Sequence, residues 1–368
     1  MKSWTHTGYG QLIRFGPGTL GDVGRLVREV GCRRVLLVTT EGRLSSDDGR
    51  RLAQALGSDL ESTFAGVRSH VPARAVQAAV QQARRDGVDG VVSFGGGSCA
   101  DLGKAVCFFT EQEAGTPGAS FLDRPALPHV AVPTTYSGAE LTSFFGMTDE
   151  ATRRKAGAGG PTVAPVVAVY DPEVTLSTPA GVSAETGMNA LAHCVECAYS
   201  PSRTPEAEAV ALAGVRRIGA ALPEVIDDPA DLGARTEMLA GAVLGGRALQ
   251  NASMGVHHGL SQLVGGRTGI AHGLANALIL AHAVRFNADA VPAELRRIGE
   301  ALGDPSDPAG AIERLAARLG LPSRLSEAGV TEDDIDAVVR LSGSNRNVAA
   351  NPKPVSEEDA RAILEAAF

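Results

Sequence analysis

The sequence lacks any long apolar run, and it is poor in cysteine and in basic charge. No stretch reaches the roughly 18 consecutive apolar residues of a membrane helix, and the N-terminus, Met1 to Gly10, has no apolar signal core. Five cysteines, an odd number in 368 residues, do not suggest a disulfide framework. The net charge of −8 argues against the basic surface of a general nucleic-acid binder. We therefore expect a cytoplasmic protein with neither a membrane nor a nucleic-acid partner.

The remaining composition is that of an ordinary globular protein, with 44% hydrophobic and 21% charged residues. A chain of 368 residues can bury a large core and is long enough for two domains. Cys194 and Cys197 form a C-x-x-C pair, but no second pair accompanies them. We interpret them as small packing residues of a helix.

The first half of the chain alternates apolar, β-branched runs with helical patterns. Such alternation is typical of a parallel α/β sheet. The run Val35-Leu36-Leu37-Val38 has the composition of a buried parallel strand. The predicted strands are 11–15, 34–40, 62–65, 90–94 and 129–132, with extended segments in 161–170; the predicted helices are 22–30, 47–56, 72–86 and 99–108.

After Pro179 the pattern becomes almost entirely helical. We therefore predict an α/β domain over 1–180 and an all-helical domain over 181–368. The predicted helices of the second domain are 206–221, 232–249, 258–263, 274–285, 293–302, 308–319, 332–341 and 357–368.

The segment Gly95-Gly96-Gly97-Ser98 stands between a predicted strand and a predicted helix. Glycines there let the backbone approach a phosphate, and the helix start supplies free N–H groups and a positive dipole end. The alternative is a tight strand-to-helix turn without a ligand. Lys104, two turns into the helix, either belongs to the same site or is solvated.

Two further turns are predicted at the same edge of the sheet. Thr134, Thr135 and Ser137 follow a strand and offer hydroxyl groups, and ligands of such folds bind beyond the carboxyl ends of the strands. Thr39, with Thr40 and Glu41, follows another strand and is placed to meet an adenosine ribose, although a plain loop is equally consistent. Together these turns predict a nucleotide site.

Four of the eight histidines are at positions 193, 257, 258 and 272. Asn189 and His193 are four residues apart and share one face of a helix. Gly265, Gly266 and Gly269 predict that the helix after His258 gives way to a loop, and that His272 lies close to the start of a third helix. Because the fourth group, Asn189, is a neutral amide, the cluster is either a weak metal site or a polar substrate pocket.

Several segments resemble the iron-containing alcohol dehydrogenase superfamily, and within it the maleylacetate reductases. The resemblance extends nearly from end to end. It is carried by the glycine turn at 95–98, Val132-Pro133-Thr134-Thr135-Tyr136-Ser137-Gly138-Ala139-Glu140, Tyr170-Asp171-Pro172, Gly187-Met188-Asn189-Ala190, His257-His258 and Asn351-Pro352-Lys353-Pro354.

The resemblance implies a Rossmann-like N-terminal domain and a helical C-terminal domain, in a dehydroquinate synthase-like architecture with the active site in the cleft. It also implies NADH or NADPH as hydride donor, and a homodimer. The matching cofactor-binding positions are Gly95, Gly96, Gly97, Ser98, Thr134, Thr135 and Ser137, and Lys155 matches a lysine that approaches cofactor or substrate.

In the metal-dependent relatives an Asp and three His hold an ion, at positions that correspond here to Asn189, His193, His258 and His272. An amide at the Asp position is common in the maleylacetate reductases, which are regarded as working without a metal. We therefore predict that these four residues are catalytic and that no metal is bound.

The implied reaction is the NAD(P)H-dependent reduction of maleylacetate, or a related carboxylated enone or keto acid, to 3-oxoadipate, in aromatic ring-cleavage catabolism or a specialised biosynthetic pathway. Candidate basic partners for the substrate carboxylates are Lys155, Arg247, Arg346 and Lys353.

Three departures from the branch keep alternatives open. The second histidine one turn after His258 is Gln262, the usual His-Ala-Glu-Thr-His is replaced by 272–276, and the C-terminal Tyr is missing from 347–354. The alternatives are a metal-dependent alcohol dehydrogenase or aldehyde reductase, and a degenerate non-redox homologue. Glu41 beside a ribose favours NADH over NADPH, because it repels a 2′-phosphate.

Overall fold

The computed structural model describes residues 3–8, 10–115, 127–149 and 154–368, without the side chains of residues 154 and 155. The chain forms two compact units, Gly8–Thr178 and Pro179–Phe368, and the described residues up to Thr7 join the second unit. The Thr7 backbone N–H donates to Asn251 Oδ1 at 2.7 Å, and Asn251 Nδ2 donates to Thr7 O at 3.0 Å. The first residues are therefore attached to the helical unit, whereas the predicted first domain began at residue 1.

The first unit is built on a six-stranded parallel sheet, which confirms the predicted fold class. The strand order is β1-β8-β5-β4-β2-β3, and all pairings between these strands are parallel. The strands are β1 (Leu12–Phe15), β2 (Val35–Val38), β3 (Leu60–Phe64), β4 (Gly90–Gly95), β5 (His129–Pro133) and β8 (Val167–Tyr170).

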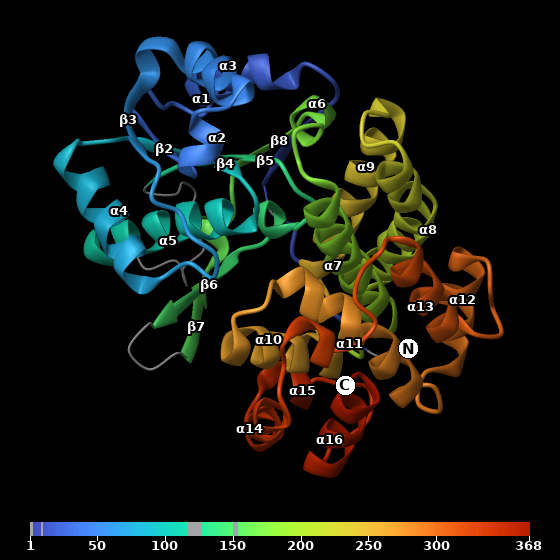
Figure 1. Cartoon of the computed structure of the whole chain (residues 1–368). Helices are drawn as coiled ribbons and strands as arrows, with labels where there is room; N and C mark the ends of the chain where they lie inside the picture. Colours follow the sequence, from blue (N-terminus) through green and yellow to red (C-terminus); the bar gives the residue numbers. More distant parts are fainter. Residues whose placement is uncertain (1–2, 9, 116–126, 150–153) are drawn as a thin grey trace. The chain divides into compact units, whose positions relative to one another are not determined.

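Helices cover both faces of this sheet, because successive strand side chains point to opposite faces. On β2, Val35 and Leu37 pack with α1 (Val23–Glu29) and α3 (Asp47–Leu56). Leu36 and Val38 pack with α4 (Ala73–Arg85) and α5 (Gly97–Glu113) on the other face. Figure 1 shows the sheet between these two helical layers.

A two-stranded antiparallel ribbon lies outside the predicted elements of this unit. It consists of β6 (Phe144–Asp149) and β7 (Arg154–Gly159). Four of the six β7 residues are Gly or Ala, which are depleted in strands, so local composition does not indicate it. Short helical segments complete the unit: η1 (Thr19–Asp22), α2 (Glu41–Leu44), η2 (Gly57–Asp59), η3 (Ala139–Leu141), η4 (Pro161–Val163) and α6 (Pro172–Thr175).

The second unit is helical. Its helix α7 packs against α8, α9 and α11, and α10 packs against α11, α14 and α15. No helix in the described part of the chain is long and apolar enough to span a membrane. The helices are α7 (Ala180–Tyr199), α8 (Pro205–Asp227), α9 (Leu232–Leu249), α10 (Val256–Thr268), α11 (His272–Phe286), α12 (Pro292–Leu302), α13 (Pro308–Arg318), η5 (Ser326–Ala328), α14 (Glu332–Ser342), α15 (Arg346–Ala349) and α16 (Glu357–Ala366).

Helix α10 is longer than its glycines predicted. It continues through Gly265 and Gly266 and ends at Gly269, which has φ of 79° and donates its N–H to Gly265 O at 3.0 Å. Packing of Leu260 and Val264 in the core of the unit stabilises the helix beyond what glycine propensity allows. The predicted loop is therefore only the short connection before α11, which begins at His272, two residues before the predicted helix 274–285.

Candidate active site

The strand order of the first unit reverses at β2. This strand pairs with β3 on one side and with β4 on the other. In open parallel sheets, ligands bind outside the carboxyl ends of the strands at such a switch point. The residues after Val38 and after Gly95 therefore occupy the position expected of a nucleotide site.

The glycine turn and the threonine turn lie against each other there. Thr134 N donates to Gly95 O at 2.9 Å, and a Cβ added to Gly97 would come within 2.9 Å of Ser137 Oγ. Gly96 caps α5, whose free N–H groups and positive end suit a phosphate. The hydroxyls of Thr134 and Thr135 are buried without a hydrogen-bond partner among the described residues. Such hydroxyls fit the oxygens of a bound pyrophosphate, so the turns suit a dinucleotide.

Thr39 has a structural contact in place of the predicted ribose contact. It is fully buried, and its hydroxyl donates to Phe94 O at 2.7 Å, which links β2 to β4. Any contact with a ribose at this strand end is left to the residues that follow. Thr40 caps α2 by accepting from Arg43 N at 3.2 Å, and Glu41 is exposed.

Lys104 is neither solvated nor free for a phosphate. Its ammonium is fully buried and donates to Ala139 O at 2.7 Å and to Thr142 Oγ1 at 2.9 Å, with Asp101 Oδ1 at 2.8 Å. It therefore holds the segment that follows the threonine turn. The backbone of Lys155 lies in β7, but its side chain, predicted near cofactor or substrate, lies outside the described residues.

The predicted histidine group lies in the helical unit, on three helices. Asn189 and His193 come from α7, His258 comes from α10, and His272 begins α11. The His193 and His258 rings are stacked with centroids 4.8 Å apart and planes 16° apart. The His272 ring centroid is 6.1 Å from that of His258. Within the described chain, His193 Nδ1 and His258 Nε2 are buried without a hydrogen-bond partner.

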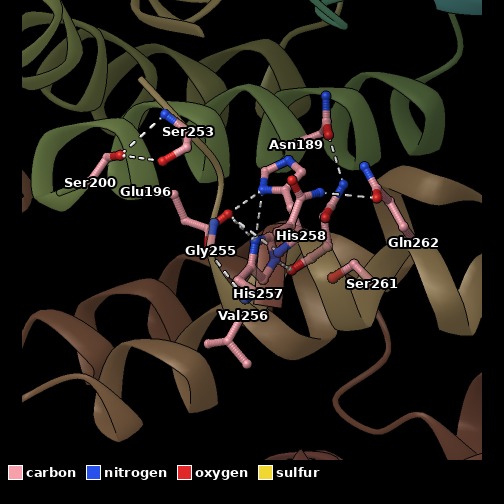
Figure 2. Close-up of polar contacts among 12 residues, drawn as sticks. Asn189, Glu196, Ser200, Ser253, Gly255, Val256, His257, His258, Ser261 and Gln262 are labelled. Atoms are coloured by element: carbon pink, nitrogen blue, oxygen red, sulfur yellow. Dashed lines mark hydrogen bonds and ion pairs between the residues drawn. The ribbon is translucent and has the colours of Figure 1, made fainter. Parts of the chain in front are cut away.

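A buried carboxylate stands behind these rings. Figure 2 shows Glu196, one turn beyond His193 on α7, directed at His257 and His258. Glu196 Oε2 lies 2.6 Å from His258 Nδ1, and Oε1 accepts from the backbone N–H of Gly255 at 3.0 Å and of His257 at 3.2 Å. Burial alone would raise the pKa of Glu196, but the neighbouring His257 and His258 lower it below its usual range.

A lowered pKa keeps the Glu196 carboxylate charged, whereas it keeps the imidazoles of His193 and His258 neutral. Burial holds the pKa of His193 well below its usual value, and the neighbouring His258 adds to that decrease. Burial also lowers the pKa of His258, against the effect of the Glu196 hydrogen bond. These directions favour neutral rings at His193 and His258 beside an ionised carboxylate at Glu196.

Two amide pairs complete the group. Asn276 Nδ2 on α11 donates to Asn189 Oδ1 at 2.7 Å. Asn347 Nδ2 on α15 donates to Gln262 Oε1 at 3.1 Å. Two of the three departures from the branch thus take part in a pair: Gln262 bonds Asn347, and Asn276 bonds Asn189.

The donor groups as placed do not fit a tightly held divalent metal. An imidazole binds an ion in its own ring plane at about 2.0–2.1 Å, and the nearly parallel planes of His193 and His258 do not meet at such a point. Asn189 contributes an amide oxygen in place of a carboxylate. Among the described residues, one group of three His, Cys, Asp or Glu brings its ligand atoms within 4.8 Å of one another, namely Glu196, His257 and His258. These atoms already bond one another, and the absence of a resident metal stays a prediction.

Of the four basic residues proposed for substrate carboxylates, two are engaged elsewhere. Arg247 pairs with Glu206 at 3.3 Å, and Lys353 pairs with Asp289 at 2.7 Å. Arg346 is exposed at the start of α15, beside Asn347, and forms no ion pair within the described residues. Among the candidates whose side chains the structure describes, it is the one that remains available.

Comparison with known proteins matches both units. A family model described as iron-containing alcohol dehydrogenase matches residues 11–172, and one described as the C-terminal part of the Fe-containing alcohol dehydrogenase family matches 183–368. The chain belongs to the iron-containing alcohol dehydrogenase family. Membership confirms the resemblance, and it makes the chain an NAD(P)H-dependent reductase.

Relatives within the family are similar over almost the whole chain. A maleylacetate reductase of Burkholderia cepacia is 35% identical over 97% of this chain and 95% of its own length. The crystal structure of maleylacetate reductase from Agrobacterium tumefaciens has a TM-score of 0.88 and 33% identity, over 100% of this chain and 99% of that one. A sulfoacetaldehyde reductase from Bifidobacterium kashiwanohense, solved with NAD+, has a TM-score of 0.90 and 26% identity, over 100% and 99% of the two chains.

Glu196, Asn276 and Asn347 were not identified as site residues from the sequence. Glu196 had a detectable signal, because it is the one charged side chain in the apolar stretch Ala190–Tyr199 of a helix that already carried two predicted site residues. The amides had no such signal. Their partners lie far along the chain, 87 and 85 positions away.

Proposed function

We propose that this reductase acts on maleylacetate, or on a closely related carboxylated enone or keto acid, and forms 3-oxoadipate or its analogue. The observation that carries the proposal is the amide at Asn189, bonded to Asn276, in a chain whose relatives include several maleylacetate reductases. A carboxylate at this position would repel a dicarboxylate substrate, whereas the amide adds no charge.

The turns at Gly95–Ser98 and Thr134–Ser137 would hold the dinucleotide. A bound reduced nicotinamide supplies the hydride. Reduction of the enone places negative charge on the substrate oxygen, and the protein must stabilise that charge and supply one proton. His193, His258 and His272 are proposed to line the substrate pocket. The rings among them that carry a proton towards the substrate perform these two tasks.

Arg346 is proposed to receive a substrate carboxylate. Its guanidinium is not committed to an ion pair among the described residues, and a planar fork suits a carboxylate bidentately. An Arg346→Gln variant should raise KM for the dicarboxylate much more than KM for an uncharged aldehyde. Equal effects on both substrates would remove Arg346 from carboxylate recognition.

The second candidate, a metal-dependent aldehyde reductase, is favoured by one feature. The stretch Gly273-Leu274-Ala275-Asn276 is more typical of the alcohol dehydrogenases than of the maleylacetate reductases. It would require an ion to polarise the carbonyl, in a group whose rings and amide do not suit one.

Cofactor oxidation with maleylacetate, measured against a panel of small aldehydes with and without added divalent metal, separates the candidates. The proposal expects the highest kcat/KM with maleylacetate and no metal requirement. Activity only with aldehydes and added metal would establish the second candidate. Binding of neither NADH nor NADPH would instead indicate the degenerate, non-redox homologue.

The finer cofactor choice proposed is NADH, supported by the Glu41 carboxylate that follows β2 and Thr40. A Glu41→Ser variant should then accept NADPH more readily, seen as a higher ratio of kcat/KM with NADPH to kcat/KM with NADH.

We also propose a homodimer, to be measured by sedimentation. A reducing cytoplasm is proposed as the compartment, because the five cysteines are all free and buried.

A further inference from the structure

We propose that Glu196 is a positioning residue that fixes His258 in the tautomer with the proton on Nδ1, so that Nε2 presents a lone pair. The inference rests on the proposed role of His258 in the reductase. In this tautomer the His258 ring accepts a hydrogen bond at Nε2 at the start of the reaction. Donation to the substrate carbonyl then comes from other groups of the site.

The tautomer follows from a chain of donors and acceptors. His257 Nε2 lies 2.9 Å from Asn276 O, and a carbonyl only accepts, so His257 Nε2 carries the proton. In the neutral ring, His257 Nδ1 is then an acceptor. It faces His258 Nδ1 at 3.2 Å, which therefore must be the protonated nitrogen.

Glu196 also requires a proton on His258 Nδ1. Its Oε2 lies 2.6 Å from His258 Nδ1, and an ionised carboxylate can only accept. Two independent acceptors, Glu196 and His257 Nδ1, thus converge on one ring nitrogen. The neutral His258 ring consequently has its bare nitrogen at Nε2, the atom that is buried without a partner within the described chain.

The carboxylate itself is held rigidly. Glu196 is fully buried and accepts backbone N–H groups from Gly255, His257 and, at 3.3 Å, His258. The same side chain therefore fixes both the start of α10 and the ring orientation of a residue on that helix. A carboxylate behind an imidazole is the usual device that sets which nitrogen faces the reacting group.

Glu196→Gln should reverse the assignment. An amide has one oxygen, and the Oε1 position receives two backbone N–H groups while the Oε2 position receives one. The amide oxygen should take the first position, which places the NH2 group against His258 Nδ1. His258 must then accept at Nδ1 and carry its proton on Nε2.

The test uses full-length enzyme labelled with 15N-histidine and long-range 1H–15N spectra, with the His258 signals identified by their loss in His258→Gln. We expect a protonated Nδ1 and an unprotonated Nε2 in the wild type, the opposite in Glu196→Gln, and the wild-type pattern in Glu196→Asp. Glu111→Gln, which alters a buried carboxylate of the other unit, should leave the His258 signals unchanged.

Turnover should fall about 10- to 100-fold in Glu196→Gln, the usual cost of losing such a supporting group, with KM for the dinucleotide unchanged and partial recovery in Glu196→Asp. A proton on Nε2 of His258 in the wild type would overturn the proposal even if Glu196→Gln does not fold. If the tautomer is as stated but His258→Ala retains full turnover, the positioning role stands and the proposed function of His258 fails.

Discussion

The His193 ring lies over the His258 ring, with the ring centroids 4.8 Å apart and the planes within 16° of each other. Stacking directs the in-plane lone pairs of the two imidazoles along nearly parallel planes. A group arranged in this way serves two separate contacts with a substrate better than it serves a single ion. The amide of Asn189 acts in the same direction, because it contributes no charge to offset a cation.

Purified enzyme should therefore contain well below one metal ion per chain, and chelator treatment should leave turnover unchanged. Asn189→Asp should increase the affinity for divalent metal, because it restores the missing anionic ligand. Elemental analysis and activity before and after chelation measure both expectations. Stoichiometric metal in the wild type, lost together with activity, would contradict the first.

Replacing His258 by Ala should reduce turnover by on the order of a hundredfold or more, the typical contribution of an acid–base or electrophilic group. The measurement is steady-state cofactor oxidation, with folding checked by thermal unfolding. His282→Ala is the matched control, because His282 is a half-buried histidine on α11. Near-normal turnover in His258→Ala would remove this residue from the mechanism.

Gly97→Ala should weaken dinucleotide binding about tenfold or more, equivalent to about 1.4 kcal/mol. The added Cβ would lie 2.9 Å from Ser137 Oγ and 3.1 Å from Ser137 Cβ, so the two turns must separate at the proposed phosphate site. Fluorescence titration with NADH reports the Kd. In the Gly21→Ala control the new Cβ meets nothing within 4 Å. Equal Kd values for the two variants would argue against the site.

His129 should make the folded state sensitive to acid. Burial, followed by the charge of Lys104, lowers its pKa to about 3 from the ordinary 6.5. Between these values the unfolded chain binds a proton that the folded chain does not, so the free energy of unfolding falls as pH decreases from 6.5 towards 3. The loss from this group approaches about 1.4 kcal/mol per pH unit.

His129→Gln should flatten this dependence, since an amide can replace the 2.8 Å contact with Ser93 Oγ without titrating. Denaturant unfolding at several pH values between 6.5 and 5 measures the slope. His6→Gln, at a less buried site, serves as control. Parallel slopes in wild type and His129→Gln would show that His129 is not the acid-sensitive group.

Local patterns predicted the elements whose residues determine their own conformation. The β-branched run of β2 and the glycine turn after β4 carry their signals within a few residues, so their positions followed from the sequence. β7 did not, because Gly and Ala in a strand are stabilised only by the partner strand. α10 continued through Gly265 and Gly266 because core packing outweighs the propensity cost of glycine.

The site residues also differ in how far the sequence alone could predict their roles. His193, His258 and His272 stood out as a cluster of an uncommon residue type. Thr39 was misleading, since its place after a strand could not show that its hydroxyl would bond Phe94 O inside the sheet. Lys104 likewise resembled a solvated or ligand-binding cation until its buried carbonyl partners were known.

The sequence by itself determined the alternation of strands and helices in the first half and the helical second half, the turns that suit a dinucleotide, and the replacement of an acidic residue by Asn189. These depend on residue type and spacing along a short stretch of chain. Only the tertiary structure decided which atom of His258 is available. That choice depends on Glu196, 62 positions away, and on an Asn276 carbonyl that reaches it through His257. Hydrogen-bond direction is a property of groups brought together by packing, so spacing alone does not determine it.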